Sequence, residues 1–252
     1  MSIWGKIVGG AAGFALGGPI GALLGGLAGH AVDRMRDSTE EALIAEKEGR
    51  TPDGPERSIA FTIGVIVLGA KMAKVDGAVT RDEVAAFKEV FKVPPEEMRN
   101  VGRIFNQARR DAQGFEPYAR QLGRMFRSNP RILEELLDGL FHIARADGQV
   151  QETELAYLEK VAEYFGLSQA DWERIRAANM GPAEDDPYVI LGIPPEADEE
   201  TLRRSHRDLV REHHPDRLIA QGLPEEFVDL ANEKLARINR AWAEIKRRRG
   251  MR

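Results

Sequence analysis

Carboxylates recur in two turns whose spacing is typical of a metal-binding loop. The pattern A-x-x-D-G-x-V-x-x-x-E occurs twice, 71 residues apart. Asp-Gly followed by a downstream Glu is the second half of a calcium loop of the EF-hand type. The first two ligand positions hold Met72 and Lys74 in one copy and Ile143 and Arg145 in the other. Neither copy alone can therefore enclose calcium. Two copies brought together would offer four carboxylates, those of Asp76, Glu83, Asp147 and Glu154.

A structural role for the same acids is the alternative, and it is the one we favour. Each turn joins the end of one predicted helix to the start of the next, where acidic side chains stabilise a helix N-terminus. Gly77 and Gly148 can end the preceding helices, and Thr80 with Glu83 reads as a capping box. A divalent metal therefore remains a hypothesis beside this one.

A second candidate site is the tripeptide His214-Pro215-Asp216, called the HPD loop below. Pro215 fixes φ and lacks an N–H, which stiffens the loop, and Asp216 offers a carboxylate to a bidentate arginine. The preceding helix carries a basic stripe at i, i+4 and i+8, consisting of Arg203, Arg207 and Arg211. Such a stripe steers toward an acidic partner in a salt-sensitive way, although alone it is also typical of a solvated helix face.

Glycine recurs every fourth residue at the N-terminus, at Gly5, Gly9, Gly13, Gly17, Gly21, Gly25 and Gly29. No charge occurs between residues 7 and 29, a helical length of roughly 34 Å that suffices to cross a membrane. Small residues on one face let a second helix approach closely in lipid. The ladder predicts a transmembrane helix within residues 1–36 that pairs two copies of the chain.

Charge predicts the orientation of this span. Lys6 precedes it, whereas Arg34 and Arg36 follow it, so the positive-inside tendency places the C-terminal side in the cytoplasm. A cleaved signal peptide and a re-entrant hairpin turning at Pro19 are the alternatives. The pattern does not distinguish a straight span from one kinked at Pro19.

The composition limits the function of the remaining chain. The chain has 252 residues, no cysteine and a net charge of −5, which excludes disulfides and thiolate chemistry and argues against bulk nucleic-acid binding. A charged linker spans 37–57, and about seven amphipathic helices follow in 58–178. The apolar run near residues 59–70 is too short for a second span and predicts a buried helix. A hydrolase is disfavoured because the only histidine there, His142, lies in an apolar run.

The C-terminal region follows a short linker at 179–184 and occupies residues 185–252. Its periodicity predicts helices over 198–213 and 224–248, with Leu202 and Leu209 on the buried side of the first. Phe227, Ile238 and Ile245 should face inward on the second. The predicted fold is therefore all-α, with the HPD loop at the tip of an antiparallel helix pair.

DPYVILGI, the HPD loop and NEKLARINRAW together resemble a J domain. The resemblance implies a DnaK-type chaperone as partner, whose ATP hydrolysis the HPD loop triggers. It assigns docking to Arg203, Arg204, Arg207 and Arg211, called the arginine face below. Asp208 and Glu212 stand where J domains are often basic, and His213 replaces a common Tyr, which implies weaker or more selective docking. His213 would cap the helix or pack.

The doubled acidic turn resembles the TerB-like helical domain, which implies an all-α bundle with a suspected metal or partner site and no catalytic reaction. The order of the three parts, with WGKIVG at the start and EHHPDRLIAQGLP near the end, resembles DjlA-type co-chaperones of Gram-negative bacteria. This implies a single-pass inner-membrane protein with its J domain in the cytoplasm and a self-associating span. We expect a membrane-tethered co-chaperone that is not an enzyme and needs no cofactor; the alternative is a metal- or stress-sensing adaptor with the J domain as output.

Overall fold

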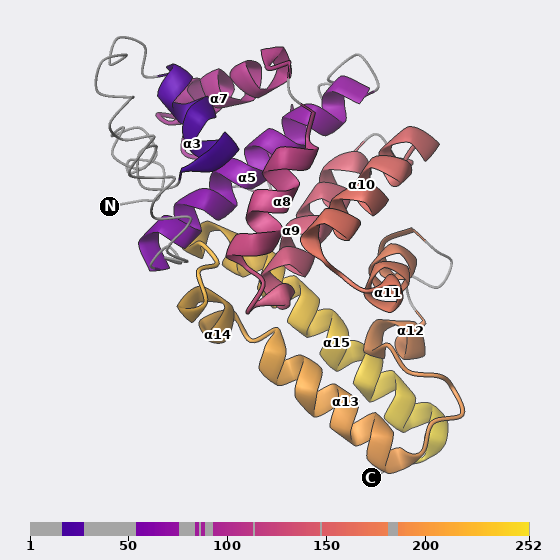
Figure 1. Ribbon diagram of the computed structural model, residues 1–252. Coiled ribbons are helices and arrows are strands. Elements are labelled where there is room, and N and C mark those ends of the chain that lie inside the picture. The colour runs from indigo at the N-terminus through magenta and orange to yellow at the C-terminus, as the bar shows by residue number, and fades with distance from the viewer. Residues whose placement is uncertain are drawn as a thin grey trace.

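The computed structural model describes residues 17–27, 54–75, 84–85, 87–88, 93–112, 114–146, 148–180 and 186–251. Within these ranges the chain forms helices joined by turns and contains no strand, which confirms the all-α prediction. A helical bundle occupies one end of the molecule, and a long helix pair extends from it (Figure 1). The bounds are α3 (Gly18–Leu27), α5 (Gly54–Val75), α7 (Met98–Arg110), α8 (Glu116–Met125), α9 (Pro130–Ala144), α10 (Glu152–Phe165), α11 (Gln169–Met180), α12 (Pro187–Leu191), α13 (Glu199–Glu212), α14 (Pro215–Ala220), η2 (Glu225–Phe227) and α15 (Val228–Arg249).

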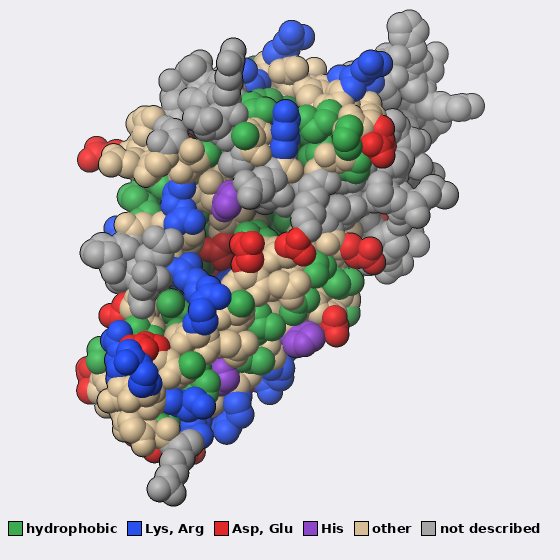
Figure 2. All heavy atoms as spheres, turned by 180° about the vertical axis from the view of Figure 1, so that it is seen from behind, with side chains coloured by type: hydrophobic (Ala, Val, Ile, Leu, Met, Phe, Trp, Pro, Cys, Tyr) green, Lys and Arg blue, Asp and Glu red, His purple; other side chains and the backbone are tan. Residues whose placement is uncertain are grey.

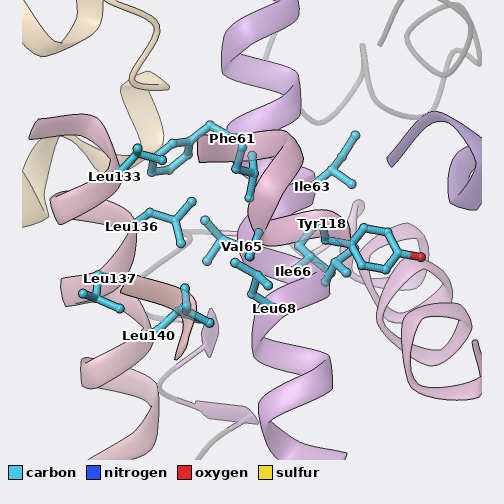
Figure 3. Close-up of a cluster of buried hydrophobic side chains, with 14 of the residues drawn as sticks. Phe61, Ile63, Val65, Ile66, Leu68, Tyr118, Leu133, Leu136, Leu137 and Leu140 are labelled. Atoms are coloured by element: carbon cyan, nitrogen blue, oxygen red, sulfur yellow. The ribbon is translucent and has the colours of Figure 1, made fainter. Parts of the chain in front are cut away.

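Helix α5 lies at the centre of the bundle because its middle, residues 59–70, is apolar except for Thr62. All residues from 59 to 73 are buried, and α7, α8, α9 and α10 pack around them. A helix without a polar face must be enclosed in this way. Leu133 and Leu136 of α9 lie across from Phe61 and Val65 of α5 (Figure 3). The predicted buried helix is confirmed.

Two glycines let α8 approach its neighbours closely. A Cβ at Gly64 of α5 would lie 2.6 Å from Cδ1 of Leu122, and a Cβ at Gly123 of α8 would overlap the carbonyl oxygen of Tyr164. Gly123 requires glycine because the clash is with backbone, whereas at Gly64 the Leu122 side chain would have to shift. The resulting tight layer of α5, α8 and α10 gives the bundle a rigid framework.

Helix α3 is the described part of the glycine ladder. Gly17 and Gly18 adopt left-handed φ angles of 53° and 57°, so a turn precedes Pro19 and the helix begins there. Gln121 of α8 holds this turn, since it accepts from the Ile20 N–H and donates to the Gly17 carbonyl, both at 3.0 Å. No helix among the described residues is both long and apolar enough to cross a membrane.

The glycine ladder is described in part. Gly5, Gly9, Gly13 and Gly29 lie outside the described residues, whereas Gly17, Gly21 and Gly25 lie within them. Gly21 is buried, and Leu23 and Leu24 beside it join the bundle core. Pairing of two copies through this ladder stays a prediction.

The C-terminal helices α12, α13 and α15 build a second, smaller core. It contains Leu202 and Leu209 of α13 and Ile238 and Ile245 of α15, as the periodicity predicted. Asp198 caps α13, because its side chain accepts from the Thr201 N–H at 2.7 Å. We call α12 to α15 the hairpin domain.

The connection between α13 and α15 belongs to the bundle instead. Leu218, Leu223, Phe227 and Ala231 are buried in the same core as α5 and α9. The ring of Phe227 meets that of Phe61 edge-on, with centroids 4.7 Å apart. The expectation that Phe227 faces into the hairpin is therefore wrong, because the nearest large apolar surface at that point is the first half of α5.

Candidate partner-docking site

The HPD loop lies between α13 and α14, and two of its three side chains are open to solvent. The His214 side chain is 50% exposed and that of Asp216 is 90% exposed. Pro215 is buried in the first turn of α14, where its missing N–H is not needed. Nδ1 of His214 accepts from the Asp216 backbone N–H at 3.3 Å and so caps the helix. The loop presents an imidazole and a carboxylate on a stiff support.

The arginine face lies on the outer side of α13. Exposed pairs such as those it makes with neighbouring acids contribute at most about 1 kcal/mol, so a partner can displace them at small cost. Lys and Arg side chains also lie over the hairpin domain on the side of the molecule seen in Figure 2, which is turned away from the viewer in Figure 1. The pairs are Arg203–Glu199 at 2.5 Å, Arg204–Glu200 at 2.9 Å and Arg211–Asp208 at 2.8 Å.

Stacked rings hold α13 against α15 behind this face. His206 lies parallel to Trp242 with ring centroids 4.9 Å apart, and its Nε2 lies 3.1 Å from Oδ1 of Asn239. The guanidinium of Arg203 also lies over the Trp242 ring, 6.0 Å from its centroid. These contacts fix the helix that carries the arginines.

Two residues that depart from the usual J-domain pattern contact the bundle. Oε2 of Glu212 lies 2.8 Å from Nε of Arg131, near the start of α9. His213 is fully buried, with Nδ1 2.8 Å from Oε1 of Glu135. His213 therefore packs, as expected, but against the bundle and not within the hairpin domain.

A buried polar cluster continues from these contacts. Glu134 and Glu135 of α9 are each 1% exposed. Nζ of Lys234, from α15, lies 3.1 Å from Glu135 and 2.7 Å from Asp138. Arg174 of α11 pairs with Glu134 at 2.8 Å. A cavity of about 340 Å³ opens beside the cluster, between α9, α11, α13 and α15.

The cluster fixes the charge of its members. Burial alone would raise the pKa of Glu135, but Lys234 and the hydrogen bond from His213 outweigh it and lower that pKa to about 2. Burial and then Lys234 lower the pKa of His213, and Glu135 opposes this only in part. At neutral pH a neutral His213 therefore donates from Nδ1 to an ionised Glu135.

Of the four carboxylates proposed as metal ligands, one, that of Glu154, lies among the described residues. Glu154 is 2% exposed, and its Oε2 accepts from the Gln151 N–H at 2.9 Å in a capping box at the start of α10. This is the structural role that we favoured from the sequence. Asp76, Glu83 and Asp147 lie outside the described residues, so metal binding stays a hypothesis. Within the described ranges, no group of three His, Asp or Glu side chains could hold a metal ion.

The sequence reasoning missed the residues of the bundle that meet the hairpin domain. A signal for them was present, because Glu134, Glu135 and Asp138 interrupt a helix that is otherwise rich in leucine. Buried acids require a partner. Arg131 lies within reach of Glu134 on the same helix, but the partner of Glu135 and Asp138 is Lys234, about 100 positions later in the sequence. The pattern indicated a partner without identifying it.

Comparison with known families divides the chain into three matched segments. Residues 1–46 match the co-chaperone DjlA transmembrane domain, residues 62–177 the tellurite resistance protein TerB family, and residues 186–249 the DnaJ domain. No solved structure matches the chain.

Relatives named Co-chaperone protein DjlA align from end to end. The protein from Photobacterium profundum is 29% identical, over 98% of this chain and 99% of the relative. That from Escherichia coli K12 is 27% identical over 99% of both, and that from Coxiella burnetii 28% over 98% of both. The three segments in this order, together with relatives matched over their whole length, show that the chain belongs to the DjlA family of membrane-anchored J-domain co-chaperones.

Proposed function

We propose that this protein recruits a DnaK-type chaperone and stimulates its ATP hydrolysis through the HPD loop. The observation that carries the proposal is the exposed His214 and Asp216 at the end of a helix whose outer side is lined with arginine. The chain holds a J domain and belongs to a co-chaperone family, which supports the same function.

In this proposal the arginine face attracts the chaperone, and the HPD loop triggers its ATP hydrolysis. The arginine face steers the protein toward an acidic surface of the chaperone and orients it there. Asp216 accepts a bidentate arginine, and Pro215 keeps the loop from yielding when that contact forms. ATP is hydrolysed within the partner, so this chain contributes recognition and no reacting group.

We also propose that the protein is a single-pass inner-membrane protein whose helical domains face the cytoplasm and whose span pairs two copies. The match to a transmembrane domain and the arginines at residues 34 and 36 support this arrangement. Pairing would raise the effective concentration of two J domains near one client.

Sidedness can be tested directly because the chain has no cysteine. Single variants Ser2→Cys and Ser38→Cys are exposed to a membrane-impermeant thiol reagent in intact spheroplasts. The proposal expects labelling of the first and protection of the second until the membrane is opened. The reverse pattern contradicts it.

The function itself is tested by titrating the full chain, in detergent, into DnaK and measuring steady-state ATP hydrolysis. Asp216→Asn should abolish stimulation because the amide cannot replace a carboxylate opposite a bidentate arginine. Glu163→Gln, an equivalent change on an exposed residue of α10, should stimulate like the unaltered chain. Equal stimulation by the Asp216 variant would exclude the proposed role of the loop.

A further inference from the structure

We infer that the bundle positions the HPD loop, with Arg131 and Glu135 of α9 as the positioning residues. This inference rests on the proposed co-chaperone function and deepens it, because it assigns the TerB-like bundle a part in triggering. The bundle and the J domain then act as one unit, not as two modules on a linker.

Helix α9 holds the chain immediately before the HPD loop. Glu212 pairs with Arg131 and His213 with Glu135, each at 2.8 Å, and the next residue is His214. His213 has no exposed surface. Two consecutive side chains are thus fixed to a helix about 80 positions earlier in the sequence.

The same helix holds the chain where it returns from the loop. Lys234, near the start of α15, lies between Glu135 and Asp138 at 3.1 and 2.7 Å. Glu135 therefore contacts both limbs of the helix pair, His213 on α13's C-terminal side and Lys234 on α15. Glu135 thus bridges the two limbs at the base of the loop.

The segment after the HPD loop is fixed by apolar contacts. Leu218 and Leu223 are buried in the bundle core. Oγ of Ser58 donates to the carbonyl of Gly222 at 2.9 Å. Gly222 has a φ of +111°, and a Cβ there would lie 2.9 Å from Cβ of Arg57, so the turn fits closely against the first turns of α5.

The polar contacts of this interface orient the HPD loop more than they stabilise the fold. Burying ion pairs gains little free energy over apolar contacts, but buried polar groups accept few alternative partners and so specify one arrangement. Apolar contacts through Leu218, Leu223 and Phe227 supply the adhesion. The side chains proposed to meet the partner stay open to solvent, since that of Asp216 is 90% exposed and that of Arg211 67%. The bundle supports the loop without covering it.

The test uses the full chain in detergent and changes only the bundle. Arg131→Ala removes the contact with Glu212, and Glu135→Gln weakens those with His213 and Lys234. Arg176→Ala and Glu163→Gln make the same changes on exposed residues of α11 and α10. Hydrogen exchange is measured over residues 213–223, and DnaK ATP hydrolysis is titrated with each protein. Exchange over the buried helices α5 and α10 confirms that each variant is folded.

We expect exchange over 213–223 to quicken about tenfold in both interface variants, because each loses a charge-assisted hydrogen bond. The maximal stimulation should fall about threefold or more, with less than about twofold change in the half-maximal concentration, because the arginine face is intact. The controls should match the unaltered chain.

Three results overturn the inference. Unchanged exchange would mean that α9 does not hold the loop. Faster exchange with unchanged stimulation would mean that the contact with α9 does not contribute to triggering. Higher stimulation would mean that the bundle restrains the loop. If the unaltered chain fails to stimulate, the proposed co-chaperone function fails, whereas the exchange measurement still reports whether α9 holds the loop.

Discussion

His213 stands immediately before the HPD loop, and its side chain is enclosed by charged groups from several helices. Glu134 and Glu135 approach it from α9 and Lys234 from α15, with Arg131 and Arg174 on the far side of Glu134. Its Nε2 has no hydrogen-bond partner among the described residues. The folded protein therefore disfavours protonation of this ring.

This burial predicts a pH dependence of stability. The pKa of His213 is lowered from the usual 6.5 by burial and by Lys234, so the unfolded chain binds a proton first as the pH falls. The free energy of unfolding should therefore be lower at pH 5.5 than at pH 7.5, because stability is lost where the unfolded state binds more protons. Urea unfolding at the two pH values measures this difference.

His213→Phe provides the control, since it cannot titrate. Its unfolding free energy should change less between the two pH values than that of the unaltered chain. An equal or larger change in the variant would assign the pH dependence to other groups.

At the scale of elements, α13 has two faces with separate roles. Leu202 and Leu209 bury its inner side against α15, while the arginine face points outward. Arg207 is exposed and makes no ion pair with any described residue, so its charge is available to a partner.

Arg207→Ala should weaken DnaK binding and reduce its dependence on salt, while the fold is unaffected. Loss of one exposed charge at an interface acts mainly on the association rate, which salt screening also controls. Binding kinetics at about 50 and 200 mM salt measure both effects. Arg176→Ala, on α11, should bind as the unaltered chain does; identical salt dependence for both variants would exclude a docking role for Arg207.

The elements differ in how far the sequence predicted them. The apolar periodicity of α13 and the continuous apolar run of α5 are local signals, and both helices were predicted. The ends of α13 were nearly correct, whereas α5 begins at Gly54, inside the predicted linker, and continues to Val75. The HPD loop was also found from a local signal, the tripeptide itself. The partners of Glu135 and the place of Phe227 depend on contacts between residues 78 or more positions apart, which no local pattern specifies. The start of α3 at Gly18 depends on Gln121 in the same way.

At the scale of the whole molecule, the bundle and the J domain share one apolar core. Leu218, Leu223, Phe227 and Ala231 of the hairpin domain are buried with α5 and α9, while a smaller core lies farther along the helix pair. Domains joined by a linker alone unfold independently. A shared core instead predicts a single cooperative unfolding transition for the described helices.

Phe227→Ala should divide this transition into two and lower the stability by about 3–5 kcal/mol, the usual loss for removing a buried aromatic ring. Thermal unfolding followed by near-ultraviolet circular dichroism and by tryptophan fluorescence, to which Trp172 of α11 and Trp242 of α15 both contribute, reports the two effects. Phe165→Ala, which removes a buried ring of α10 far from the hairpin domain, should destabilise while keeping one transition. Two transitions in the unaltered chain would contradict the shared core.

The most direct test of the central claim is single-turnover hydrolysis of ATP bound to DnaK, with the full chain or its His214→Gln variant added. The claim is that the exposed HPD loop triggers hydrolysis in the partner. It predicts that the unaltered chain accelerates the single turnover and that the variant leaves the basal rate unchanged. Equal acceleration by both proteins, or none by the unaltered chain, would contradict it.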